Sequence, residues 1–192
     1  MRLFVALEIP AAVRDNLAAQ MKELRDLSRQ VADKRPRWMR PENLHVTLKF
    51  IGEVSPANLE NIREALTAIH RDAPVHLEFR GLGFFPSQQH PRVLWAGIEA
   101  SPNLPSLAAD IDSALETQGV AREERAFAPH LTLARFEPPG LHDKLRTMIQ
   151  QNSGREFGSL QAREFHLVES HLRLAAAEYT SLASFPFAAL EA

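Results

Sequence analysis

Residues 43–50 read NLHVTLKF and residues 129–136 read PHLTLARF, so the phrase His-x-Thr-Leu occurs twice in one chain. In both copies apolar residues alternate with polar ones, which is the pattern of a β-strand with one buried and one exposed face. The chain has only eight histidines in 192 residues, so chance placement is a poor explanation of the match. We interpret each copy as a strand and the pair as evidence for two related halves.

The segments around the two phrases follow the same order along the chain. Each phrase is followed by a proline, an amphipathic helix and further alternating segments. Two copies are too few for a stacked solenoid, so we expect a single domain over residues 1–192 whose two halves close around one cleft. The predicted helices span residues 11–30, 56–70, 104–119 and 139–150, and the predicted strands span residues 2–9, 44–52, 75–85, 92–98, 130–136, 164–174 and 178–187.

Composition excludes several classes of function. The formal net charge is -2, so the chain has no overall positive field, and any contact with nucleic acid must be local. Without cysteine it has no disulfides, no thiolate metal sites and no cysteine nucleophile. The apolar stretch at the start ends at Glu8 and Pro10, and no long apolar run follows. We therefore expect a cytoplasmic protein without a membrane segment.

The repeated phrase places a histidine and a threonine on one face of each strand. Successive strand residues point to opposite faces, so His45 shares a face with Thr47, and His130 shares a face with Thr132. An imidazole, with a pKa of about 6.5, can donate or accept a proton near neutral pH, and a hydroxyl can donate a hydrogen bond to a phosphoryl oxygen. Two histidines without a carboxylate cluster make a poor metal site. The pattern indicates metal-free acid–base chemistry on a phosphate.

Together with these phrases, RWMRPENLH at residues 37–45, FFPSQQHPRVLWAGI at residues 84–98 and the opening MRLFVAL resemble the two-histidine phosphoesterase superfamily. The resemblance is to the bacterial RNA 2',3'-cyclic phosphodiesterases, also called 2'-5' RNA ligases, and covers nearly the whole chain. It implies an α+β fold of two pseudo-symmetric lobes, each an antiparallel sheet with helices on its outer face, with the active-site cleft between them. It also implies a reaction without metal or cofactor that opens a 2',3'-cyclic phosphate on RNA or a nucleotide, leaving a 2'-phosphate.

The resemblance assigns a role to each residue of the phrase. It makes His45 the general acid that protonates the leaving 3' oxygen and His130 the general base that activates water. Thr47 and Thr132 would hold the phosphate.

The resemblance also makes Arg135 a phosphate ligand. Simple alternation from His130 puts Arg135 on the opposite face of the strand, so this role requires a bulge or the end of the strand near Ala134.

Two alternatives to hydrolysis stay open at this point. The first is the reverse displacement, in which a 5' hydroxyl replaces water and joins RNA ends through a 2'-5' bond; the high concentration of water favours hydrolysis. The second is a non-catalytic module that binds RNA or a nucleotide, although binding alone needs no matched pair of histidines. The sequence does not identify the physiological RNA, and we expect the protein to be a monomer.

A basic loop leads into the first phrase. It is either a solvated loop or a patch that steers an RNA end by local charge. Four aromatic residues could stack a base, although for Trp95, which lies in an apolar strand, we expect packing in the core. The basic residues are Lys34, Arg35, Arg37 and Arg40, and the aromatic residues are Trp38, Phe84, Phe85 and Trp95.

Overall fold

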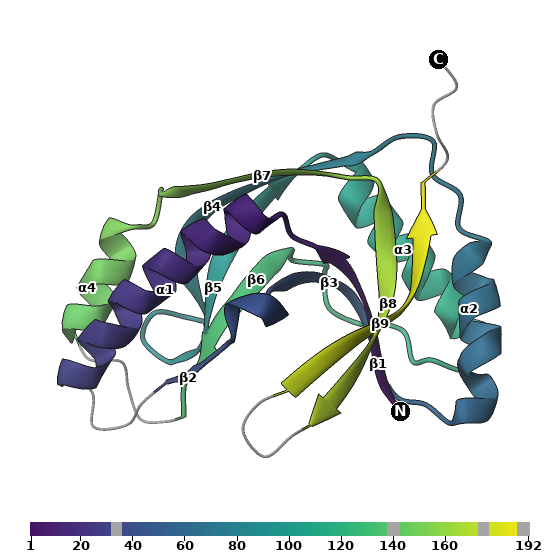
Figure 1. Ribbon diagram of the computed structural model, residues 1–192, viewed down its shortest axis with the longest axis horizontal. Coiled ribbons are helices and arrows are strands. Elements are labelled where there is room, and N and C mark those ends of the chain that lie inside the picture. The colour runs from purple at the N-terminus through teal and green to yellow at the C-terminus, as the bar shows by residue number, and fades with distance from the viewer. Residues whose placement is uncertain (32–35, 138–142, 173–176, 188–192) are drawn as a thin grey trace.

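The structure is a computed structural model that describes residues 1–31, 36–137, 143–172 and 177–187. Two antiparallel sheets form the framework of the described residues (Figure 1). The first sheet has the strand order β3-β1-β8-β9 and the second has the order β2-β6-β5-β4-β7. The strands are β1 (Arg2–Glu8), β2 (Arg37–Trp38), β3 (His45–Glu53), β4 (Val75–Pro86), β5 (Pro91–Ala100), β6 (His130–Arg135), β7 (Glu156–Ala162), β8 (Glu164–Leu172) and β9 (Ala177–Pro186).

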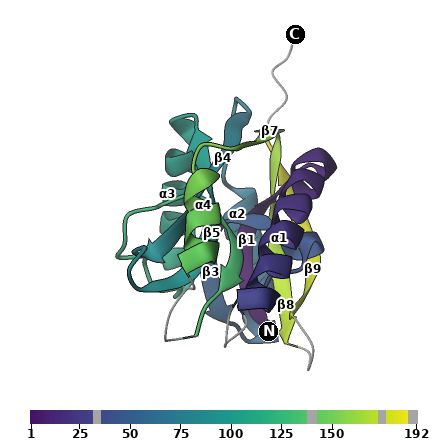
Figure 2. The same cartoon turned by 90° about the vertical axis from the view of Figure 1, so that its left-hand side faces the viewer.

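Each sheet is covered by two helices. Helices α1 (Ala11–Val31) and α4 (Asp143–Gln151) contact each other and the second sheet, and they lie side by side in Figure 2. Helices α2 (Leu59–Thr67) and α3 (Asn103–Glu116) contact each other and the first sheet. The predicted α+β arrangement of two antiparallel sheets with helices is confirmed. Among the described residues, none of the helices combines the length and apolar character that crossing a bilayer requires.

Two of the helices follow a strand of one sheet in the chain but pack on the other sheet. Helix α1 follows β1 of the first sheet but packs on β7 of the second, and α3 follows β5 of the second sheet but packs on β3 of the first. The apolar stripes of all four helices enter one continuous hydrophobic core that contains strands from both sheets. This exchange of helices supports our proposal that the chain forms one bilobal domain.

The two halves are related by a pseudo-symmetry that pairs β3 with β6. In each half a strand, β1 or β5, leads through a helix to the motif strand beside it, and a shorter helix follows. The first six positions of β3 and of β6 also share one order of burial, half-buried, buried, half-buried, buried, buried and exposed. The repeated phrase therefore occupies the same structural place twice.

The predicted boundaries are mostly accurate, and two strands are absent from the prediction. The helix predicted from residue 56 begins with a 3-10 turn at Pro56–Asn58. Residues 139–142 of the helix predicted at 139–150, and residues 173–174 of the strand predicted at 164–174, lie outside the described residues. Strand β2 has two residues and no recognisable pattern. In β7 the register shifts near Gly158, which has a φ of 121°, so its apolar residues do not alternate.

Candidate active site

The two motif histidines make the same hydrogen bond at the start of their strands. His45 Nδ1 donates to the carbonyl oxygen of Asn43 at 2.7 Å, and His130 Nδ1 donates to the carbonyl oxygen of Ala128 at 2.8 Å. Because a carbonyl oxygen only accepts, Nδ1 must carry the proton in both rings. In a neutral imidazole this leaves the Nε2 lone pair of each histidine available to a substrate.

Aromatic rings fix the orientation of both imidazoles. The His45 ring lies 4.6 Å from the ring of Phe4 and meets the ring of Tyr179 edge-on at 5.2 Å, centroid to centroid. The His130 ring meets Phe85 edge-on at 5.0 Å. Phe4, Tyr179 and Phe85 come from strands β1, β9 and β4, so neighbouring and distant strands together hold the two rings. The alternation of the motif itself did not predict these contacts.

Thr47 and Thr132 lie on the same strand face as their histidine, as predicted. Thr47 is paired with Ala6 of β1, and Thr132 with Trp95 of β5. Both threonines are half-buried, and neither hydroxyl has a hydrogen-bond partner among the described residues. We call the face of each sheet that carries these residues its motif face. Each motif face offers one imidazole and one hydroxyl to a substrate.

A bulge turns Arg135 towards the motif face. Between Thr132 and Ala134 the register of β6 against β5 shifts by one residue, at Leu133. As a result Thr132 is paired with Trp95 and Arg135 with Val93, and these partners stand two residues apart on one face of β5. Arg135 therefore shares a face with Thr132. The bulge that the assignment of Arg135 requires is present.

The same bulge occurs in the first motif strand, at Leu48, between Thr47 and Lys49. It places Phe50, which is 63% exposed, at the position that Arg135 holds in the second strand. The two motif faces are therefore matched in backbone but differ in chemistry at this position.

Charged residues of the second sheet affect the pKa values of two residues on the first motif face. Burial lowers the pKa of His45 below its usual 6.5; the hydrogen bond to Asn43 opposes this shift and the charge of His130 adds to it. Burial raises the pKa of Tyr179, while the positive charges of Arg135 and Arg2 oppose that change. Residues of the second sheet thus act on His45 and Tyr179 of the first. The structure places the five predicted site residues on two motif faces, and the strands that carry them, β3 and β6, contact each other.

Behind the first motif strand, Lys49 makes a buried ion pair that no pattern in the sequence indicates. Its ammonium group binds Asp112 of α3 and donates a 2.7 Å hydrogen bond to the carbonyl oxygen of Ala121. Asp112 also accepts a 3.1 Å hydrogen bond from the amide of Glu123. Burial tends to raise the pKa of Asp112, but the hydrogen bonds from Lys49 and Glu123 and the charges of Lys49 and Arg122 lower it. The pair connects β3 to the segment that leads into His130.

The expectation that Trp95 packs in the core is wrong. Leu94 and Ala96 face the hydrophobic core, whereas Trp95 is half-buried beside Thr132 on the motif face. Its ring lies over Gly83 and 5.4 Å from the ring of Phe85. Alternation did place Trp95 opposite its neighbours, but an apolar strand in sequence does not reveal which of its faces turns to the core.

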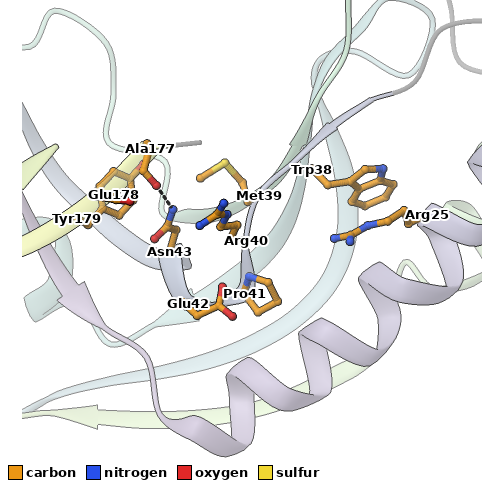
Figure 3. A pocket seen from close by; sticks show the side chains of 10 residues that line it. All are labelled: Arg25, Trp38, Met39, Arg40, Pro41, Glu42, Asn43, Ala177, Glu178 and Tyr179. Atoms are coloured by element: carbon orange, nitrogen blue, oxygen red, sulfur yellow. Dashed lines mark hydrogen bonds between the residues drawn. The ribbon is translucent and has the colours of Figure 1, made fainter. Parts of the chain in front are cut away.

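A pocket of about 660 Å³ adjoins the first motif strand without including either motif histidine. Figure 3 shows it between α1, the segment from Trp38 to Asn43, and the start of β9. Asn43 and Tyr179, which both contact His45, form one of its walls. No group of three histidine or carboxylate side chains in the described ranges could hold a metal ion.

The chain is similar to proteins of one family over most of its length. The model of the LigT like phosphoesterase family matches residues 7–95 and 98–175. The RNA 2',3'-cyclic phosphodiesterase of Methanothermobacter thermautotrophicus is 32% identical over 185 residues, which cover 96% of this chain and 97% of the relative. The protein of the same name from Archaeoglobus fulgidus is 33% identical over 172 residues, which cover 90% of this chain and 92% of the relative.

Solved structures have the same fold. The crystal structure of TT0787 of Thermus thermophilus matches with a TM-score of 0.79 at 27% identity, over 97% of this chain and 98% of that one. The crystal structure of E. coli LigT complexed with 3'-AMP matches with a TM-score of 0.76 at 25% identity, over 97% of each chain.

Proposed function

The chain belongs to the LigT-like phosphoesterase family, and we propose that it is an RNA 2',3'-cyclic phosphodiesterase that hydrolyses the cyclic phosphate to a 2'-phosphate without a metal ion. The substrate is an RNA end or a nucleotide with a 2',3'-cyclic phosphate. One observation carries the proposal: both motif histidines have Nδ1 fixed by a backbone carbonyl, which leaves two Nε2 atoms for proton transfer.

The two histidines divide the proton transfers of the reaction. His130 Nε2 accepts a proton from water as the water oxygen forms a bond to phosphorus. The bond between phosphorus and the 3' oxygen breaks, and His45 Nε2–H gives its proton to that oxygen. The products are a 3' hydroxyl and a 2'-phosphate, and a proton moves from His130 to His45 through solvent before the next turnover.

Three further side chains stabilise the phosphate in this scheme. Thr47 and Thr132 donate their hydroxyl protons to phosphoryl oxygens, one from each motif face. Arg135, which the bulge at Leu133 turns to the same side, pairs with the negative charge that grows on those oxygens. Because the first strand has Phe50 at the corresponding position, the cation acts from one side only.

The lowered pKa of His45 affects its role as the acid. In the free protein burial favours the neutral form of this ring, whereas a general acid must carry its proton when the substrate reacts. The cyclic phosphate carries a negative charge, and its binding favours the imidazolium. Substrate binding therefore supplies the conditions under which His45 can act as the acid.

The proposal is tested by incubating the EDTA-treated protein with a 2',3'-cyclic mononucleotide and identifying the product. We expect turnover without added metal and a 2'-phosphate as the only product. A 3'-phosphate would reverse which oxygen His45 protonates. Tight binding without turnover would instead identify a binding module, and an RNA joined through a 2'-5' bond in the presence of a 5' hydroxyl end would identify the reverse reaction.

We also propose that the protein works as a monomer in the cytoplasm. Both motif histidines come from a single chain, so the site needs no residue from a second copy. The absence of cysteine fits a protein that does not depend on disulfides.

A further inference from the structure

The pocket beside the first motif strand shares two of its lining residues, Asn43 and Tyr179, with the contacts of His45. We call it the side pocket and define it by Arg25, Trp38, Arg40, Glu42, Asn43 and Tyr179. The carbonyl of Asn43 accepts the His45 hydrogen bond, and the Tyr179 ring meets the His45 ring at 5.2 Å. Asn43 and Tyr179 therefore connect the side pocket to His45.

Two arginines bring positive charge to the side pocket. Arg25 extends from α1 and Arg40 comes from the opposite wall (Figure 3). Within the described residues, neither guanidinium has a carboxylate oxygen within 4.0 Å, although Glu42 and Glu178 also line the pocket. Cations that are not neutralised by neighbouring carboxylates are suited to an anionic group such as a phosphodiester.

An aromatic surface lies next to the first of these cations. The Arg25 guanidinium carbon is 5.9 Å from the centre of the Trp38 ring. Arg25 Nε and Trp38 Nε1 are buried and have no hydrogen-bond partner among the described residues. An aromatic ring beside a guanidinium group is a common platform for a nucleobase.

The carboxylate of Glu42 favours a whole nucleotide over a lone phosphate. Glu42 lines a pocket that also contains two arginines, and a carboxylate accepts hydrogen bonds from ribose hydroxyls and base amino groups. A site for phosphate alone would gain nothing from this carboxylate. The volume of about 660 Å³ lies within the range of pockets that hold small organic ligands.

Both ends of the segment that forms the pocket are held by the motif strands and their neighbours. The amide of Met39 donates a 2.8 Å hydrogen bond to the carbonyl oxygen of Leu133 in β6. At the other end, Asn43 Nδ2 donates to the carbonyl oxygen of Ala177 at 2.7 Å, drawn as a dashed line in Figure 3. The side pocket is therefore pre-formed at a fixed place relative to the candidate active site.

We propose that the side pocket binds the nucleotide that precedes the cyclic-phosphate end of an RNA strand. The inference rests on the proposed function. A 2',3'-cyclic phosphate is the 3' end of its strand, so the only chain attached to it leaves through the 5' oxygen of the terminal ribose. The phosphodiester binds Arg25 and Arg40, and the base packs on the Trp38 platform. A mononucleotide substrate leaves the side pocket unused.

The test compares a cyclic-phosphate dinucleotide with the corresponding mononucleotide. For the wild-type protein we expect the KM of the dinucleotide to be about tenfold lower than that of the mononucleotide. One stacked base and one paired phosphate together provide binding free energy of this size. In the R25Q/R40Q double variant the dinucleotide KM should rise to that of the mononucleotide, while the mononucleotide kinetics stay unchanged. R29Q, on the same helix but outside the pocket, is the matched control and should keep the preference.

Equal KM values for the two substrates in the wild type, or an unchanged preference in the double variant, would overturn the inference. Calorimetric titration of the H130A variant with both ligands separates this failure from that of the proposed function, because it measures binding whether or not the protein turns the ligands over. In that titration the dinucleotide should bind about tenfold more tightly, and R25Q/R40Q should abolish the difference.

Discussion

His45 and His130 have the same backbone partner in the two halves, since each Nδ1 donates to the carbonyl two residues before it, at 2.7 and 2.8 Å. The shared hydrogen bond selects one tautomer in both rings. What differs is the surroundings: His45 is enclosed by Phe4 and Tyr179, whereas His130 has one aromatic neighbour among the described residues, Phe85. Equal geometry with unequal surroundings allows one ring to serve as acid and the other as base.

Replacing either histidine should remove the activity and leave the fold intact. We expect H45A and H130A each to lower kcat for a 2',3'-cyclic nucleotide by about a hundredfold to ten thousandfold, the range of general acid–base catalysis. H70A, at an exposed position far from the motif in sequence, is the control and should retain wild-type activity. Substantial turnover by both motif variants, with circular dichroism spectra like that of the wild type, would contradict the assigned roles.

The pH dependence of the reaction should reflect the lowered pKa of the buried His45. Burial lowers the pKa of His45 below 6.5, and its proposed role requires the protonated form. Because kcat/KM reports the free enzyme, it should fall as pH rises through a value below 6.5. In the kcat profile the same limb should lie at higher pH, since bound cyclic phosphate favours the imidazolium. The experiment measures kcat/KM and kcat against pH for one mononucleotide substrate. A falling limb at the same pH in both profiles would mean that the charge of the substrate does not act on His45.

Arg135 should matter for the phosphate and not for the fold. R135Q removes an exposed cation that the bulge at Leu133 turns to the motif face, so its stability should equal that of the wild type. We expect kcat/KM to fall by about tenfold to a hundredfold, as loss of a charge-assisted hydrogen bond predicts. R92Q removes an exposed arginine from the other face of β5 and should have no effect. Equal activities for these two variants would place Arg135 outside the site.

The spacing of apolar residues predicts the strands, the apolar stripes of the helices and the shared face of each His–Thr pair, because one face of each element is buried. Arg135 could not be placed in this way, because a bulge adds one residue and reverses the alternation after Leu133. Strand β7 was missed since Gly158 interrupts its pattern. Tyr179 lies far from His45 in sequence, and only the curling of the first sheet brings the rings together.

Breaking the buried ion pair behind β3 should destabilise the protein. K49M leaves Asp112 partly buried without its main partner, at a cost of about 3 kcal/mol in the free energy of unfolding. K49M/D112L removes both charges and should recover much of that loss. K22M, which breaks an exposed pair with Asp26, should change stability by less than about 0.5 kcal/mol. Urea denaturation measures all three, and a single variant K49M as stable as the wild type would show that the pair does not hold β3 to α3.

Gly83 controls the position of Trp95, and through it the space beside Thr132. A Cβ at residue 83 would lie 2.2 Å from the Trp95 ring, which cannot yield as the end of a flexible side chain could. G83A should therefore displace the indole across the motif face, because Trp95 is the cross-strand partner of Thr132.

We expect kcat/KM to fall and the near-ultraviolet circular dichroism of tryptophan to change in G83A. G154A is the matched control: a Cβ there meets nothing within 4 Å and the residue has no positive φ, so both readouts should stay at wild-type values. If G83A alters the tryptophan signal but not the activity, Trp95 lies on the motif face without affecting the phosphate. If neither readout changes, a side chain at residue 83 does not alter the position of the Trp95 ring.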